Sequence, residues 1–174
     1  MAETSVQRSL VDSDVERRPE RIVMSLNSEY YELIWAGLKR HEFRRRFLEG
    51  QPVEWFVYLT APVSRLAAVI ELDAAVVDVP AAIAELAEQA RPGNGASVLA
   101  YVEDLPRAFA MPIRRVREYG GLDAVALKAE LGTFHPPQGY IRVARNPGWL
   151  RVCDGLVATG LVRQLTVDHA VTGG

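Results

Sequence analysis

The sequence predicts an α+β domain in which a curved sheet closes toward a barrel. Three observations support this fold class. The chain has 174 residues, 49% hydrophobic and 8% aromatic, which is the size and composition of one globular domain with a normal core. About six short segments have the alternation or the β-branched and aromatic content of strands. Three segments with helical periodicity interrupt them, so the helices are expected to flank the sheet.

The first ordered elements are a strand, a short helix and a second strand. We expect the strand at residues 21–26, which are mostly apolar. Asn27 and Ser28 then offer side-chain oxygens that can cap a helix, and apolar residues recur at helical spacing as far as Gly37, which can end it. From residue 42 the period changes to alternation, with Glu42, Arg44 and Arg46 on one face of an extended segment.

Four further elements are expected in the middle of the chain. Residues 54–60 and 66–72 are rich in β-branched and aromatic side chains and predict two strands. Pro80 is suited to the first turn of a second helix, which the segment 91–95 ends with a proline and two glycines. Residues 97–103 are a further strand candidate.

The last third of the sequence predicts a third helix at residues 122–131, a proline-rich loop and a last core strand at residues 140–144. The apolar residues beyond this strand fit either a helix or a strand. We therefore expect a domain at residues 21–148 and a C-terminal extension of uncertain structure at residues 149–174. If the extension packs against another copy of the chain, the protein is a homodimer.

The composition excludes several classes of protein. No apolar run approaches the ~18 residues that a membrane-spanning helix needs, so no membrane partner is expected. Residues 1–20 lack the apolar core of a secretory signal and are polar without a clear period, which is typical of a flexible arm. The single cysteine, Cys153, cannot form an internal disulfide. These features favour a reducing compartment, and we expect the protein to be cytoplasmic.

Motifs for metal and cofactor chemistry are absent from the sequence. His41, His135 and His169 are isolated from one another, and Cys153 has no second cysteine near it, so no metal site is expected. The chain contains neither a P-loop, nor a dinucleotide-binding glycine pattern, nor a GxSxG nucleophile motif. We therefore predict no cofactor.

Charge is segregated along the chain, although the net charge is only −2. Residues 39–46 contain five basic residues and one acidic residue, a net charge of +4. Residues 71–104 contain seven acidic residues and only Arg91 as a base, a net charge of −6. The basic segment could form a phosphate-facing patch. Alternatively, both segments are solvated faces of the domain with no ligand.

The segment 24–46 resembles the opening of an ASCH domain, within the PUA-like superfamily. That opening consists of a short strand, a helix that ends in glycine and a strand, with the pattern G-x-K-x-x-E-x-R. The pattern is matched in full by Gly37, Lys39, Glu42 and Arg44. Residues 57–62 and 134–141 also look family-like, and the whole resemblance spans roughly residues 22–144.

The resemblance implies a small PUA-like β-barrel with a cleft that binds RNA or other nucleic acid. Lys39 can meet a phosphate as a point charge, and Arg44 and Arg46 can present bidentate forks to phosphate or to a base. Glu42 can orient these arginines or accept from a base amino group; alternatively, the Glu42–Arg44 pair only stabilises the barrel. Trp55 and several tyrosines are candidates for stacking on an unpaired base. The nucleic-acid-binding candidates are Lys39, Arg40, Glu42, Arg44, Arg45, Arg46, Tyr58, Thr60 and Tyr140, with Tyr101 as a further stacking candidate.

A small hydrolase that acts on a nucleoside or RNA is the alternative. Some PUA-like relatives resemble an amidohydrolase of acylated cytidine that uses a lysine, a threonine three residues later and a glutamate on a following strand. Lys39 matches the lysine and Glu71 could match the glutamate, but Glu42 occupies the threonine position, so the hydroxyl nucleophile is missing. Either carboxylate could act as a base toward water while Lys39 stabilises an oxyanion. Ribonuclease activity, suggested for some ASCH proteins, would use Lys39, Glu42 and Arg44. The sequence favours a binding module over an enzyme.

Overall fold

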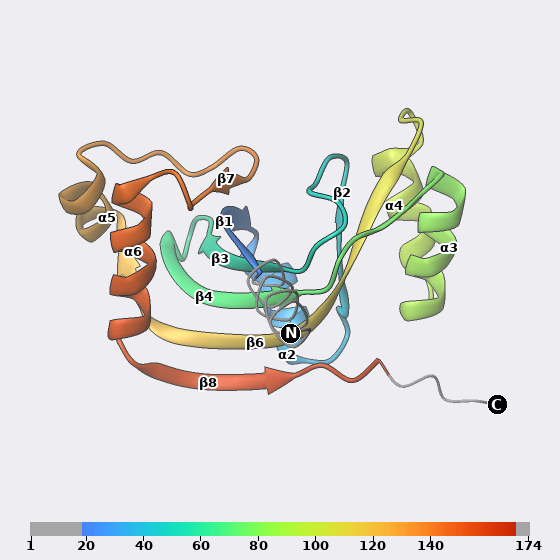
Figure 1. The fold of residues 1–174 in the computed structure, drawn as a ribbon. Helices are drawn as coiled ribbons and strands as arrows, with labels where there is room; N and C mark the ends of the chain where they lie inside the picture. The colour runs from blue at the N-terminus through green and yellow to red at the C-terminus, as the bar shows by residue number, and fades with distance from the viewer. Residues whose placement is uncertain (1–18, 170–174) are drawn as a thin grey trace, which may run out of the picture.

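The computed structural model describes residues 19–169 of the protein. In this range one mixed sheet of eight strands curls into a half-barrel that five helices flank (Figure 1). The α+β, PUA-like class is therefore confirmed. The expected flexible arm lies, apart from Pro19 and Glu20, outside the described residues. No helix between residues 19 and 169 is long and apolar enough to span a membrane.

The first five elements agree with the sequence prediction. They are β1 (Glu20–Leu26), α2 (Ser28–Trp35), β2 (His41–Arg44), β3 (Val53–Leu59) and β4 (Arg65–Leu72). Local signals account for this agreement. The Asn27 side chain accepts a hydrogen bond from the Glu29 amide at 2.8 Å and caps α2. Gly37 has a φ of +76°, which only glycine adopts without strain, and it turns the chain from α2 toward β2.

The second half differs more from the prediction. It contains β5 (Val76–Asp78), α3 (Pro80–Ala90), α4 (Asn94–Val102), β6 (Ala108–Asp123), α5 (Ala124–Leu131), β7 (Ile141–Arg142), α6 (Pro147–Ala158) and β8 (Leu161–Thr166). The helices predicted from Pro80 and at residues 122–131 are confirmed as α3 and α5. The strand expected at residues 140–144 is only the two residues of β7, which pair with β1.

The strand predicted at residues 97–103 is wrong, because most of this segment belongs to α4. Its β-branched and aromatic content suggested a strand, but Val98 and Val102, four residues apart, are the side chains it buries. They pack with Ile83 and Ala87 of α3 in a small separate core. Burial at the helical period therefore overrides the strand propensity, and α3 and α4 form a helical hairpin.

Strand β6 is the longest element, and the sequence prediction missed it. Its first part lies between β2 and β5, and its second part lies between β4 and β8. Pro112 stands where β6 passes from β2 to β4. It is the last residue that pairs with β2, and its carbonyl accepts from the Asp73 amide at 2.9 Å. A proline at such a transition removes little of the ladder.

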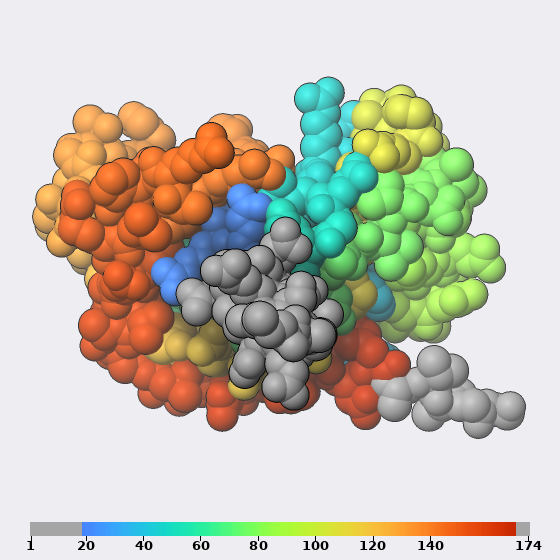
Figure 2. Space-filling view, viewed as in Figure 1, coloured from blue at the N-terminus to red at the C-terminus, as the bar shows by residue number. Residues whose placement is uncertain are grey.

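The C-terminal residues that the sequence left unplaced form α6 and β8. Helix α6 buries Trp149, Val152, Cys153 and Leu156, and β8 pairs antiparallel with β6. Burial raises the pKa of the Cys153 thiol to about 12, so this cysteine packs as an apolar group. In the space-filling view, β8 follows the lower edge of the molecule, α5 and α6 lie on one side, and α3 and α4 lie on the other (Figure 2).

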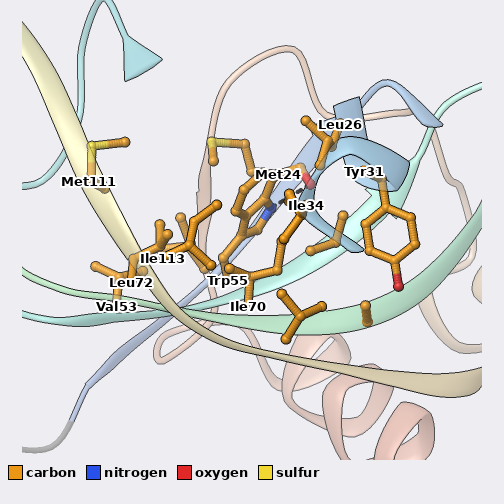
Figure 3. Packing of buried hydrophobic residues seen from close by; sticks show 14 of the residues in the cluster. Met24, Leu26, Tyr31, Ile34, Val53, Trp55, Ile70, Leu72, Met111 and Ile113 are labelled. Atoms are coloured by element: carbon orange, nitrogen blue, oxygen red, sulfur yellow. Dashed lines mark hydrogen bonds between the residues drawn. The ribbon is translucent and has the colours of Figure 1, made fainter. Parts of the chain in front are cut away.

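The main core packs side chains of β1, β3, β4 and β6 against Tyr31 and Ile34 of α2. Trp55 of β3 is at its centre and is 0% exposed. Its indole N–H donates to the Met24 carbonyl of β1 at 2.8 Å (Figure 3). Strands β1 and β3 run parallel over seven residues, from Glu20 opposite Val53 to Leu26 opposite Leu59. This core holds the C-terminal ends of β1 and α2 in place through Leu26 and Ile34. Strand β2 follows α2 in the chain.

Candidate functional site

A cavity of about 390 Å³ opens where β1, α2, β2 and the α3–α4 hairpin meet. Its volume lies within the range of roughly 300–1,000 Å³ that small-molecule sites occupy. The G-x-K-x-x-E-x-R motif lines it from Lys39 to Arg44, and the polar and aromatic residues that line it from other elements are Ser25, Asn27, Tyr30, Arg91, Asn94, Ser97 and Tyr101. The cavity therefore joins the motif to a helical hairpin that begins about 40 residues later in the chain.

Glu42 stands between two cations inside this cavity. It is 5% exposed, and no other charged residue of the described chain is classed as buried. Lys39 Nζ lies 3.1 Å from Oε2, and Arg44 Nε lies 2.9 Å from Oε1. Both cations are also held by backbone carbonyls, since Lys39 Nζ donates to His41 and Arg44 Nη2 donates to Ser25. The alternation of β2 places Glu42 and Arg44 on the same face, as the sequence predicts.

One oxygen of Glu42 keeps its hydrogen-bonding capacity. Among residues 19–169, the Lys39 ammonium at 3.1 Å is the partner of Oε2, and no further hydrogen bond reaches this oxygen. A carboxylate oxygen has two lone pairs, so the contact with Lys39 leaves room for a second donor. A ligand N–H that enters the cavity would satisfy this oxygen.

The cavity is strongly positive. Lys39, Arg40, Arg44 and Arg91 line it, and Glu42 is the one acidic residue among the described lining residues, so their net charge is +3. His41 adds no charge at neutral pH, because burial and the neighbouring His169, Lys39 and Arg40 lower its pKa to about 4. In a chain of net charge −2, this concentration of cations favours an anionic ligand.

Two exposed tyrosines line the same cavity. Tyr30 of α2 is 53% exposed and Tyr101 of α4 is 44% exposed. Lys39 Nζ lies 5.9 Å from the centroid of the Tyr30 ring, and the Arg45 guanidinium lies 5.8 Å from that of Tyr101. Exposed rings beside cations are surfaces on which an unpaired base can stack.

Of the predicted site residues, the structure brings Lys39, Arg40, Glu42 and Arg44 together in the cavity. Arg45 does not line it. Its guanidinium binds both carboxylate oxygens of Asp104, at 2.7 and 2.8 Å, and donates to the Tyr101 carbonyl, so this arginine ties β2 to the end of α4. Arg46 is exposed beyond the end of β2 and lies outside the cavity lining.

The three remaining binding candidates lie elsewhere. Tyr58 is 3% exposed and packs against Phe134, so it has no free face for a base. Thr60 directly follows β3, and the Tyr140 ring packs edge-on against Phe47. None of the three lines the cavity. Trp55 is also unavailable for stacking, because it lies in the core.

The sequence prediction of the binding set missed Tyr30 and Arg91. Tyr30 stood out only as an apolar position of the first helix. Arg91 is the one base in a segment whose net charge is negative, and nothing local indicates that it faces the motif. Arg91 could have been found only by predicting the helical hairpin, and the sequence predicted a strand at residues 97–103 in place of its second helix.

Glu71 lies away from the cavity. It forms a bidentate pair with Arg115 at 2.8 and 2.9 Å, and Arg117 approaches it to 3.7 Å. These hydrogen bonds, together with the charges of Arg115 and Arg117, hold the pKa of the Glu71 carboxyl below its usual range. The structure therefore does not bring Glu71 to Lys39, and its geometry is that of a sheet-stabilising ion pair.

The lowered pKa predicts a pH-dependent contribution of Glu71 to stability. A carboxylate whose pKa is lower in the folded state stabilises above the unfolded pKa, about 4.3, and loses this effect as the pH falls through the folded value. We expect Glu71→Gln to lower the free energy of unfolding by about 1 kcal/mol at pH 7, with a much smaller difference at pH 3. Urea unfolding at both pH values measures this.

The matched control is Glu130→Gln, which removes a more exposed carboxylate that lies 3.4 Å from Arg151. We expect little change at either pH for this control. A Glu71→Gln effect that is the same at pH 7 and pH 3 would contradict the prediction.

The comparisons with known proteins identify the fold. No protein-family model and no curated protein matches the chain. Crystal structures of ASCH from Zymomonas mobilis do match. One has 24% sequence identity and a TM-score of 0.66, and the match covers 78% of this chain and 94% of that one. A substituted form of that protein, ZmASCH, has 22% identity and a TM-score of 0.67, with 79% and 96% covered. This likeness, with the curled sheet and its flanking helices, shows that the protein has an ASCH-like fold.

Proposed function

We propose that the protein is a non-catalytic module that binds single-stranded nucleic acid, RNA or DNA, or a modified base, in the cavity around Lys39, Glu42 and Arg44. The observation that carries this proposal is the net charge of +3 around a buried carboxylate whose Oε2 contacts Lys39 and can accept one more hydrogen bond. Cations alone would bind any anion. The Glu42 carboxylate beside the donors Lys39 and Arg44 also matches the edge of a nucleobase, which carries N–H groups and carbonyl oxygens.

The geometry supports one arrangement of a bound base. Glu42 Oε2 accepts from an N–H of the base, and Lys39 and Arg44 donate to its carbonyl oxygens. Tyr30 and Tyr101 stack on the base or on its neighbour in the strand. A base in a duplex is stacked and paired, and extracting it costs a few kcal/mol. We therefore expect single strands to bind more tightly than duplexes. The one cysteine, buried as a thiol, fits the cytoplasm, where we propose that the protein acts.

Lys39→Gln is expected to weaken binding of a short single-stranded oligonucleotide about tenfold. The slope of log affinity against log salt separates two contacts: it falls by about one where Lys39 meets a phosphate and stays nearly unchanged where Lys39 meets the base. Fluorescence anisotropy with single- and double-stranded RNA and DNA at two salt concentrations measures both quantities. The matched control is Lys128→Gln, which removes the same charge from the last turn of α5. Equal affinity of the two variants would exclude Lys39 from the site.

The same mixtures test the alternative, a small hydrolase. Glu42 is the carboxylate that the structure places beside Lys39, so any hydrolysis of a nucleoside or RNA in this cavity would depend on it. We expect the oligonucleotides to remain intact during binding. Product formation that Glu42→Gln abolishes would instead establish the enzyme.

A further inference from the structure

We propose that Arg40 and Arg91 form a phosphate subsite at the cavity, so that the ligand is a nucleotide or a nucleotide unit of a strand rather than a free nucleoside. This inference rests on the proposed function and names the class of ligand. It starts from a difference among the four cations that line the cavity.

The cations of the cavity differ in whether an acidic residue neutralises them. Lys39 and Arg44 share Glu42. Arg40 and Arg91 form no ion pair with any acidic residue between 19 and 169. Most other arginines of the described chain do form such pairs. Two arginines at one cavity therefore carry a positive charge that no acidic residue of the described chain neutralises and that an anionic ligand would compensate.

The two arginines come from separate elements whose backbones are fixed. Arg40 precedes β2, and its carbonyl accepts from the Ile113 amide at 2.9 Å. Arg91 ends α3, where its amide donates to the Ala87 carbonyl at 3.0 Å and its guanidinium donates to Asn94 Oδ1 at 3.2 Å. The backbones of both arginines are thus held in place, while most of their guanidinium N–H groups remain available to a ligand. Paired N–H groups of this kind match phosphate oxygens in a bidentate fashion.

The different burial of Glu42, Arg91 and Arg40 indicates how a ligand would be oriented in the cavity. Glu42 is buried, Arg91 is half-buried and Arg40 is exposed. A group that hydrogen-bonds to Glu42 therefore lies deep in the cavity, and an anionic group that meets Arg40 and Arg91 lies nearer to solvent. A nucleotide has this arrangement, with an uncharged base at one end and a phosphate at the other. The phosphate would also link the strand wall of the cavity to the α3–α4 hairpin.

Competition against a labelled single-stranded oligonucleotide tests the subsite, with nucleosides and their 5′- and 3′-monophosphates as competitors. We expect at least one monophosphate to compete about tenfold or more better than its nucleoside, which corresponds to charge-assisted hydrogen bonds to one phosphate. Arg40→Gln and Arg91→Gln should each reduce this advantage, measured in each variant as the ratio of monophosphate to nucleoside competition. The control, Arg145→Gln, removes an exposed arginine outside the cavity lining and should change neither value.

The outcomes separate the two proposals. If nucleosides and monophosphates compete equally while Lys39→Gln still weakens oligonucleotide binding, the phosphate subsite is wrong and the proposed function stands. If Arg40→Gln and Arg91→Gln behave like Arg145→Gln, the subsite is wrong as well. If no oligonucleotide, nucleoside or nucleotide binds, both proposals fail. Should monomers compete too weakly to compare, the salt dependence of oligonucleotide binding decides, with an expected decrease in slope of about one for each cavity arginine and none for the control.

Discussion

Glu42→Ala is expected to lower the free energy of unfolding by about 3 kcal/mol and to abolish binding in the cavity. Removing one partner of a buried ion pair typically costs about 3–5 kcal/mol, because the remaining charge is left without compensation. Here two charges are left, since the side chains of Lys39 and Arg44 are only 16% and 21% exposed. Each keeps one bond to a backbone carbonyl, which places the expected cost at the lower end of the range.

Chemical denaturation and anisotropy on the same preparations separate the two effects of this substitution. Glu42→Gln is the matched control, because it keeps the shape and one acceptor oxygen and removes the charge. We expect it to be intermediate in both stability and affinity. If Glu42→Ala lowers the free energy of unfolding by less than about 1 kcal/mol, Lys39 and Arg44 do not depend on Glu42 for charge compensation.

Trp55→Ala is expected to have the largest effect on stability, about 4 kcal/mol. The side chain is fully buried, and truncation of a buried tryptophan typically costs about 3–5 kcal/mol through lost contacts and a residual cavity. The Met24 carbonyl also loses the indole donor. The Arg44 guanidinium lies 5.7 Å from the Trp55 ring, so the cavity floor should loosen as well.

Trp55→Phe is the control for the packing part of this effect. It keeps a ring in the core and removes the N–H donor, so we expect about half the loss of stability that alanine causes. Equilibrium urea unfolding of the three proteins gives the comparison. Equal losses for phenylalanine and alanine would mean that the hydrogen bond to Met24, and not packing, dominates.

The sequence predicted the motif half of the site but only Tyr101 of the hairpin half, and it missed Arg91, for a physical reason. Lys39, Glu42 and Arg44 belong to one short segment, where strand alternation alone places two of them on the same face. Arg91 and Tyr101 reach the cavity only because α3 packs against α4, which depends on contacts that are distant in sequence. Local propensity favoured a strand at residues 97–103, and tertiary burial overruled it.

Net charge along the chain was misleading for a related reason. The stretch 71–104 has a net charge of −6, but a sum over sequence does not record which way each side chain faces. The Glu88 carboxylate accepts from the amides of Gly93 and Gly95 and is used within the hairpin. Asp104 accepts a hydrogen bond from Arg45, and Glu71 accepts one from Arg115. Arg91, the minority charge, is the one that lines the cavity.

The long strand β6 also sets the order in which the site can be assembled during synthesis. Strand β2 carries Glu42 and Arg44, yet between residues 19 and 169 its partner is the segment from Phe109 to Pro112 of β6, about 65 residues later in the chain. At roughly 5–20 residues per second, a ribosome needs about 3–13 s to add that length. The nascent chain therefore carries the segment from Gly37 to Arg44 before this segment has a partner strand. Any function of the cavity begins only after the ribosome has released most of the domain.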